Sequence, residues 1–172
     1  MMLTAEILKD KRACGGGILF FKKNNLENKG IIFVFDCCID KKEFLYASWL
    51  LQEFKDNEEF ATTQRLVECY NRLIKDTWFN SANCLLKDFK DNKEFVTTER
   101  LVEFYTCLMG KEWFDYACWI LVDFKDNKEF VTTERLIEFC NCLTGPEKLY
   151  NTGYLLINFK DNEEFVNAVK NK

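Results

Sequence analysis

The stretch DFKDNKEFVTTERL, which runs from Asp88 to Leu101, recurs without a change from Asp123 to Leu136. A third copy, from Glu53 to Leu66, differs at only a few positions. A fixed period of roughly 20–50 residues is the signature of stacked structural repeats, so we infer that the chain grew by duplication. The tripeptide Lys-Asp-Asn marks the same place in a 35-residue period and begins at Lys55, Lys90, Lys125 and Lys160.

The 35-residue register predicts a helical hairpin in each of four units. In the best-marked copy, apolar residues three or four apart predict a first helix from about Lys128 to Leu143. Thr144-Gly145-Pro146 then favours the end of this helix and the first turn of the next. One unit earlier, Gly110 alone is expected to end the first helix, and the second helix is predicted from about Lys111 to Phe124. Asp126-Asn127 supplies side chains that cap the turn into the next unit. The predicted units are 26–60, 61–95, 96–130 and 131–165, followed by a short tail, 166–172.

The predicted fold is therefore all-α, a short solenoid of tandem helical hairpins with a non-repetitive N-terminal cap over residues 1–25. Within the cap, residues 3–11 favour a short helix with Thr4 as N-cap, and the triple glycine at 15–17 favours a flexible hinge. Residues 31–39 have partly β-branched composition, but the repeat register places them on a helix.

The composition is that of a folded protein without a membrane span or a secretory signal. Hydrophobic residues make up 48% of the chain, only one proline is present, and the net charge of −4 argues against a general nucleic-acid binder. No apolar run reaches the roughly 20 residues that a membrane helix needs. Nine cysteines, most of them in helix-like segments, favour buried thiols in a reducing cytoplasm.

The residue inventory argues against an enzyme and against a bound cofactor or metal. The chain has no histidine, which removes Ser-His-Asp and Cys-His nucleophiles and mixed Cys/His zinc sites. Carboxylates are plentiful, but they recur in repeat columns instead of converging on one asymmetric site. We therefore predict no catalytic residues, no metal site and no cofactor.

Two columns of cations are candidates for partner binding. Each cation is flanked by acidic residues, so inter-repeat salt bridges are the favoured interpretation, and a cationic ladder for acidic groups or phosphates is the alternative. The first column is Lys55, Lys90, Lys125 and Lys160, and the second is Arg65, Arg100 and Arg135, continued by Lys170.

Trp78 and Trp113 are the second candidate surface. The equivalent positions in the first and fourth units are Glu43 and Lys148, and a core position rarely alternates between tryptophan and a charge. We therefore expect both tryptophans near the surface, either as lids over the turn between two helices or as anchors for a partner.

The N-terminal third resembles a group of small bacterial and phage proteins, some of which are labelled immunity proteins. The residues that carry the resemblance are Leu3 to Gly15, Phe20 to Asn24 and Tyr46 to Leu50. The glycine that usually precedes the Ala-Cys pair is replaced here by Arg12. The resemblance implies a prokaryotic or phage origin and a binding or neutralising role.

The whole repeat is also similar, more loosely, to the pentatricopeptide repeat, which has a period near 35 and binds RNA. The first helix of that repeat is echoed by Val131-Thr132-Thr133 and Leu136-Ile137. The turn between helices is longer here, and the proline usual between those repeats is absent.

Three functional hypotheses follow from the sequence. The favoured one is a non-catalytic protein-binding repeat protein that neutralises a partner such as a toxin, a nuclease or a CRISPR effector. The alternative is an RNA-binding repeat protein, and the third is a cysteine-based redox enzyme. An uncapped last repeat further predicts a possible homodimer through the C-terminal unit.

Overall fold

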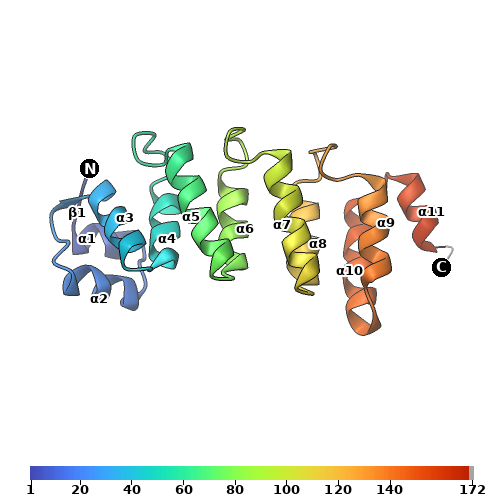
Figure 1. Cartoon of the computed structure of the whole chain (residues 1–172), viewed down its shortest axis with the longest axis horizontal. Helices are drawn as coiled ribbons and strands as arrows, with labels where there is room; N and C mark the ends of the chain where they lie inside the picture. Colours follow the sequence, from blue (N-terminus) through green and yellow to red (C-terminus); the bar gives the residue numbers. More distant parts are fainter. Residues whose placement is uncertain (171–172) are drawn as a thin grey trace. The chain divides into compact units, whose positions relative to one another are not determined.

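The computed structural model describes residues 1–170 and is 66% helical, with eleven helices in that range (Figure 1). The expected all-α class is confirmed, with the addition of two strands of two residues each. The chain divides into two compact units, Met1–Phe95 and Val96–Lys172, and the boundary coincides with the predicted border between the second and third repeats. Within residues 1–170, no helix combines the length and apolar composition needed to cross a bilayer.

The first unit begins with a small hairpin of helices held to the chain by a strand pair. Strand β1 pairs antiparallel with β2, with Met2 opposite Gly30. Thr4 caps the first helix as expected, since its Oγ1 accepts a hydrogen bond from the amide of Ile7 at 3.2 Å. The elements are β1 (Met2–Leu3), α1 (Ala5–Asp10), α2 (Gly15–Lys23) and β2 (Lys29–Gly30).

The triple glycine is not a hinge, which corrects the expectation from the sequence. It forms the first turn of α2, where Cys14 is the N-cap and its Sγ accepts from the amide of Gly17 at 3.4 Å. A Cβ atom on Gly16 would lie 2.7 Å from the hydroxyl oxygen of Tyr46. A larger residue here would displace the end of the Tyr46 side chain, so Gly16 permits the close approach of α2 to Tyr46.

Two further hairpins complete the first unit, and their second helices, α4 and α6, pack against each other. The apolar stretch that begins at Ile31 is helical, so the repeat register predicted it correctly against its β propensity. The elements are α3 (Ile31–Asp40), α4 (Phe44–Glu53), α5 (Thr63–Lys75) and α6 (Phe79–Asp88).

The second unit repeats this arrangement, with α8 packed on α10, and adds one short helix. This last helix begins at Glu163, three residues before the expected tail, and packs against α9 with Phe165 fully buried. The tail thus covers part of the fourth hairpin as far as Lys170, while 171–172 lie outside the described residues. The elements are α7 (Thr98–Gly110), α8 (Phe114–Asp123), α9 (Thr133–Cys142), α10 (Gly145–Asn158) and α11 (Glu163–Lys170).

The first helix of each repeat starts about five residues later than the apolar pattern suggests. In the fourth repeat it begins at Thr133, and not at Lys128, because Thr132 is the N-cap and accepts from the amide of Arg135 at 3.2 Å. Thr62 and Thr97 cap α5 and α7 in the same way. The residues before each cap form a compact turn that carries the Lys-Asp-Asn tripeptide.

The asparagine of that tripeptide links three of the turns to the hairpin that each turn follows. Asn127 Oδ1 accepts from the amide of Phe130 at 3.0 Å, which confirms its predicted capping role. Its Nδ2 donates to Thr98 Oγ1 at 3.3 Å, at the start of the first helix of that same hairpin. The same pair of contacts is made by Asn92 with Phe95 and Thr63, and by Asn162 with Phe165 and Thr133.

The turn inside each hairpin depends on one residue in the left-handed conformation. Lys42, Thr77 and Glu112 have φ values of 61°, 62° and 60° and stand at the same repeat position. Gly110 therefore does not end its helix in the way the sequence suggested, since the left-handed position falls at Glu112. In the fourth repeat Gly145 takes this conformation, with φ 58°, ahead of Pro146.

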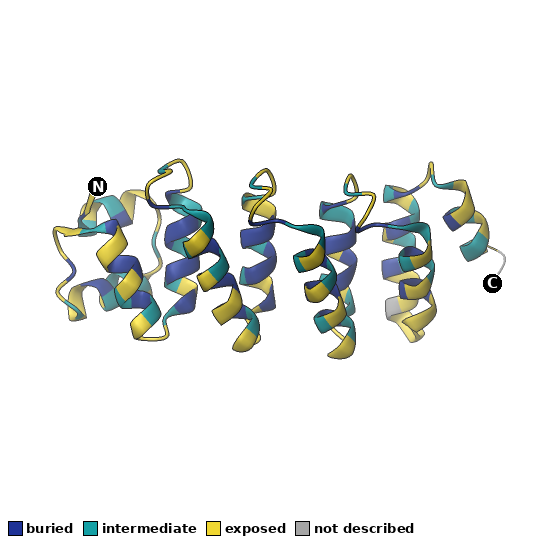
Figure 2. Ribbon diagram, turned by 45° about the horizontal axis from the view of Figure 1, so that its top comes forward, coloured by how far each residue is buried: buried dark blue, intermediate teal, exposed yellow. Residues whose placement is uncertain are grey.

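The apolar core follows the repeat columns (Figure 2). Small alanines recur on the second helices, and the phenylalanine of three inter-repeat turns contacts an aromatic ring on the first helix of the hairpin before it, as Phe130 contacts Tyr105. Both columns are fully buried: Ala47, Ala82 and Ala117, and Phe60, Phe95, Phe130 and Phe165.

Candidate functional site

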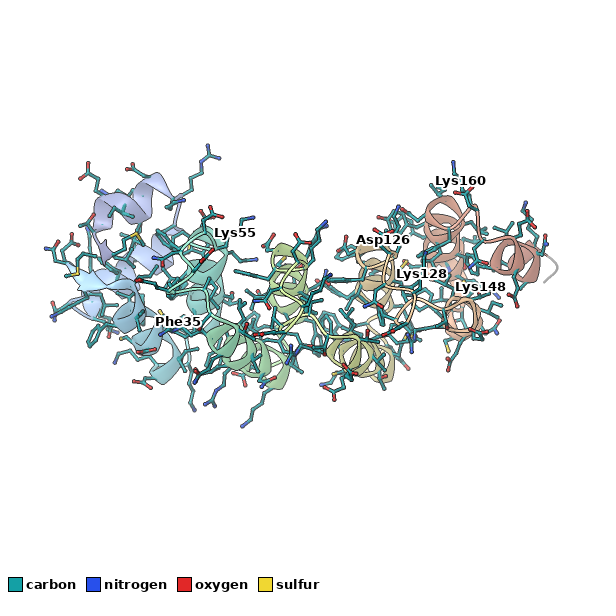
Figure 3. The ribbon with its side chains drawn as sticks, turned by 90° about the horizontal axis from the view of Figure 1, so that it is seen from above. Phe35, Lys55, Asp126, Lys128, Lys148 and Lys160 are labelled. Atoms are coloured by element: carbon teal, nitrogen blue, oxygen red, sulfur yellow. The ribbon has the colours of Figure 1, made fainter. Side chains whose placement is uncertain are left out.

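The lysine column lies on the surface, as a ladder would require. Each lysine stands in the exposed turn that follows the second helix of a hairpin: Lys55 and Lys90 in the first unit, Lys125 and Lys160 in the second. Lys55 and Lys160 are marked on these turns in Figure 3.

The surroundings of the lysines are of mixed charge. Beside Lys125, a shallow groove is lined by Lys128 and also by the carboxylates of Asp126 and Asp161. Asp126 and Lys128 both come from the turn that precedes α9 (Figure 3). A phosphate chain would therefore meet acidic groups next to each amine, which disfavours a continuous anion-binding ladder.

The arginine column is half-buried and holds the fold together. The Nη1 atom of Arg65 donates to the carbonyl oxygens of Glu59 and Phe60 at 3.1 and 3.0 Å, and its guanidinium lies 5.9 Å from the centre of the Phe60 ring. Arg135 lies over the rings of Phe130 and Tyr105 at 5.1 and 5.7 Å. Arg100 is half-buried at the equivalent position. These contacts favour a structural role for the arginines, through cation–π packing and bonds to the turn backbone.

The two tryptophans singled out from the sequence are exposed, as expected. Trp78 is 48% exposed and Trp113 is 42% exposed. They are the N-cap residues of α6 and α8, and neither side chain makes a capping hydrogen bond. They belong to different compact units, so each is considered with its own helix.

Helix α8 carries two more aromatic residues beside Trp113, and the three form a continuous face. The ring of Tyr116 lies 5.3 Å from that of Trp113 and 5.0 Å from that of Trp119. Trp119 is 38% exposed. The spacing of three residues places all three on one side of the helix. We call Trp113, Tyr116 and Trp119 the α8 aromatic face.

The repeat columns did not predict this face as a unit. Trp119 belongs to a repeat column that also holds Trp49, Cys84 and Tyr154. The signal that would have revealed the face is the spacing along the helix from Trp113. Around Trp78, the corresponding positions of α6 hold no aromatic residue. Ser81 stands in the place of Tyr116, and Cys84 in the place of Trp119.

A second apolar surface lies on α10, in the last hairpin. Leu149 is 81% exposed, whereas Phe79 at the same repeat position is 1% exposed. Ile157 is 73% exposed, and Tyr150 and Tyr154 are exposed on the same helix. We call Leu149, Tyr150, Tyr154 and Ile157 the α10 apolar face. It contains a position that is buried in the first two hairpins, at Phe44 and Phe79, and half-buried in the third.

Three buried cysteines are held in the thiol form. Burial raises the pKa of the Cys38, Cys69 and Cys118 thiols to about 12, so these side chains stay protonated near neutral pH. A nucleophilic or redox-active cysteine needs a lowered pKa instead. Among the described residues, no group of three Cys, Asp or Glu side chains is close enough to hold a metal ion.

Comparisons with protein-family models, curated proteins and solved structures find no match for this chain.

We expect substitution by alanine to lower the free energy of unfolding at the arginine column and to change it little at the lysine column. Arg65→Ala removes two bonds to turn carbonyls and a ring contact, so we expect a loss of about 2 kcal/mol in the free energy of unfolding. Lys55→Ala, at the exposed turn ten residues earlier, should change it by less than about 0.5 kcal/mol. Urea unfolding followed by circular dichroism measures both. Equal effects of the two substitutions would contradict the structural assignment of the arginines.

Proposed function

We propose that this chain is a non-catalytic, protein-binding helical-repeat protein whose partner docks on the α8 aromatic face. The observation that carries the proposal is a row of three contacting rings on one helix, in which the exposed Trp113 and Trp119 flank the half-buried Tyr116. Tryptophan and tyrosine are the residues most enriched at energetic hot spots of protein interfaces. Stacking of the hairpins into a solenoid is part of this proposal, because it would present the face on a rigid surface.

A protein partner is favoured over RNA by the charge around this face. Glu112 and Asp115 are exposed next to Trp113, and the whole chain carries a net charge of −4. Aromatic platforms that stack nucleic-acid bases usually lie in a cationic groove. The half-buried arginines point to scaffold contacts instead of such a groove. A partner with a basic rim around an apolar centre fits the face best.

The neutralising role rests on the N-terminal resemblance to immunity proteins. A binding protein of this size would act by covering a functional surface of its target. Toxins, nucleases and CRISPR effectors bind nucleic acid and carry basic surfaces, which complement the acidic charge of this chain. We place the protein in the cytoplasm of a bacterium or an infected host cell on the same basis.

We further propose that two copies associate through the α10 apolar face. In the second hairpin, the equivalent of Leu149 is buried by its neighbours, so the last hairpin offers a surface already shaped for helix packing. A two-fold arrangement would place the same residues of both copies against each other.

The docking proposal is tested by removing tryptophans from the α8 aromatic face and, separately, Trp78, which occupies the same repeat position as Trp113. A tagged chain is used to capture proteins from bacterial lysate, and the affinity for a stoichiometric partner is then measured with purified components. The double change Trp113→Ala and Trp119→Ala should weaken binding at least tenfold, because hot-spot aromatic residues are each worth roughly 2 kcal/mol.

Trp78→Ala is the matched control and should leave the affinity within about twofold, because its helix lacks the neighbouring rings. Partner binding that survives the loss of both α8 tryptophans would refute the proposed site. Co-purification of nucleic acid without protein, seen in the ratio of absorbance at 260 and 280 nm, would favour the RNA-binding alternative.

Association through α10 is tested by sedimentation over a range of protein concentrations. The wild-type chain should show a concentration-dependent dimer, and the double change Leu149→Gln and Ile157→Gln should leave only monomer. Leu19→Gln removes an exposed leucine from α2 and is the control that should still dimerise. A wild-type chain that remains monomeric at high concentration would count against this interface.

A further inference from the structure

A cavity of about 370 Å³ lies in the first unit, between the α1–α2 hairpin and the α3–α4 hairpin. Its volume falls within the range of roughly 300–1,000 Å³ that is typical of small-molecule sites. Apolar side chains form most of its wall, and they come from four different helices. The main wall residues are Leu8, Phe20, Phe21, Val34, Trp49 and Leu50.

The walls of the cavity are fixed by packing, so the space is a stable feature of the fold. Leu8, Phe21, Val34 and Leu50 are buried. The ring of Phe20 lies 5.5 Å from that of Tyr46. The close approach of α2 to Tyr46, which Gly16 permits, sets the separation of the two hairpins. This gives the triple glycine a role beyond the helix turn.

The lining of the cavity includes several polar groups and one charged side chain. Arg12 is the one charged side chain among the lining residues. It stands in the left-handed position of the turn between α1 and α2, with φ 59°, and is exposed. Asp88 does not line the cavity, but it contacts a residue that does. Its Oδ2 accepts a hydrogen bond from the side-chain Nε2 of Gln52 at 2.7 Å.

We propose that this cavity binds a hydrophobic monocarboxylate, with the apolar tail between the two hairpins and the carboxylate at Arg12. Apolar walls favour burial of the tail, since they remove it from water. A guanidinium at the rim pairs with a carboxylate through charge-assisted hydrogen bonds. Nothing in this inference depends on the partner site, because the cavity lies in the first unit and the α8 aromatic face in the second.

The experiment is a calorimetric titration of the full chain with decanoate, kept below its micelle concentration, and with decanol as the uncharged analogue. Decanoate should bind with one site per chain and at least tenfold more tightly than decanol. Phe20→Ala, in the cavity wall, should weaken both ligands by similar factors. Absence of decanoate binding to the wild-type chain would overturn the proposal.

The role of the cation is isolated by two variants of one residue. Arg12→Asn removes the charge with a residue that tolerates a left-handed backbone, so it should weaken decanoate at least tenfold and leave decanol unchanged. Arg12→Lys keeps the charge and should retain most of the affinity, since Lys42 already takes φ 61° in the equivalent turn. Unchanged decanoate binding in Arg12→Asn, with native circular dichroism, would show that the carboxylate binds elsewhere and would refute the assignment.

Discussion

The turn that connects one hairpin to the next is held in place by the asparagine at the end of the Lys-Asp-Asn tripeptide. The side chain of Asn127 caps the turn with its oxygen, and its nitrogen donates to Thr98, at the start of the first helix of the hairpin that the turn follows. One residue therefore fixes both the shape of the turn and its attachment to the previous hairpin. Because the turn also places Phe130 in the core, the polar contact positions the apolar one. Buried polar groups that are fully bonded specify a unique arrangement in a way that apolar contacts alone do not.

The sequence period predicted most of the fold because each repeat column has one physical role. The helical state of the stretch at Ile31 follows from the register, although its own propensity allows a strand. The late start of the first helix was missed because apolar spacing continues through the turn before Thr132, and side-chain caps there compete with the helix. The glycines before Ile18 were predicted to form a hinge. Their contact is with Tyr46, on a helix far away in the sequence, and a local sequence pattern does not show such a contact.

The candidate surfaces were only partly predictable. Trp113 stood out because a tryptophan alternates with charged residues at its repeat position. Trp119 fits its column, so only its neighbours in space show that it is exposed. Leu149 has an ordinary core residue type, and its exposure depends on the contacts of α10 within its own unit. Residues that conform to the repeat thus build the scaffold, and positions that depart from it, in type or in exposure, carry the candidate binding surfaces.

The most direct test of this account is a double-mutant cycle on the link between Asn127 and Thr98. The free energy of unfolding is measured by urea titration for Asn127→Ala, Thr98→Val, the double variant and the wild-type chain. We predict that the two substitutions are coupled by about 1 kcal/mol, because either one removes the same hydrogen bond between the turn and the first helix of the hairpin that it follows. Additive effects, with no coupling, would show that this hydrogen bond does not hold the turn on its hairpin and would contradict the central role of the asparagine.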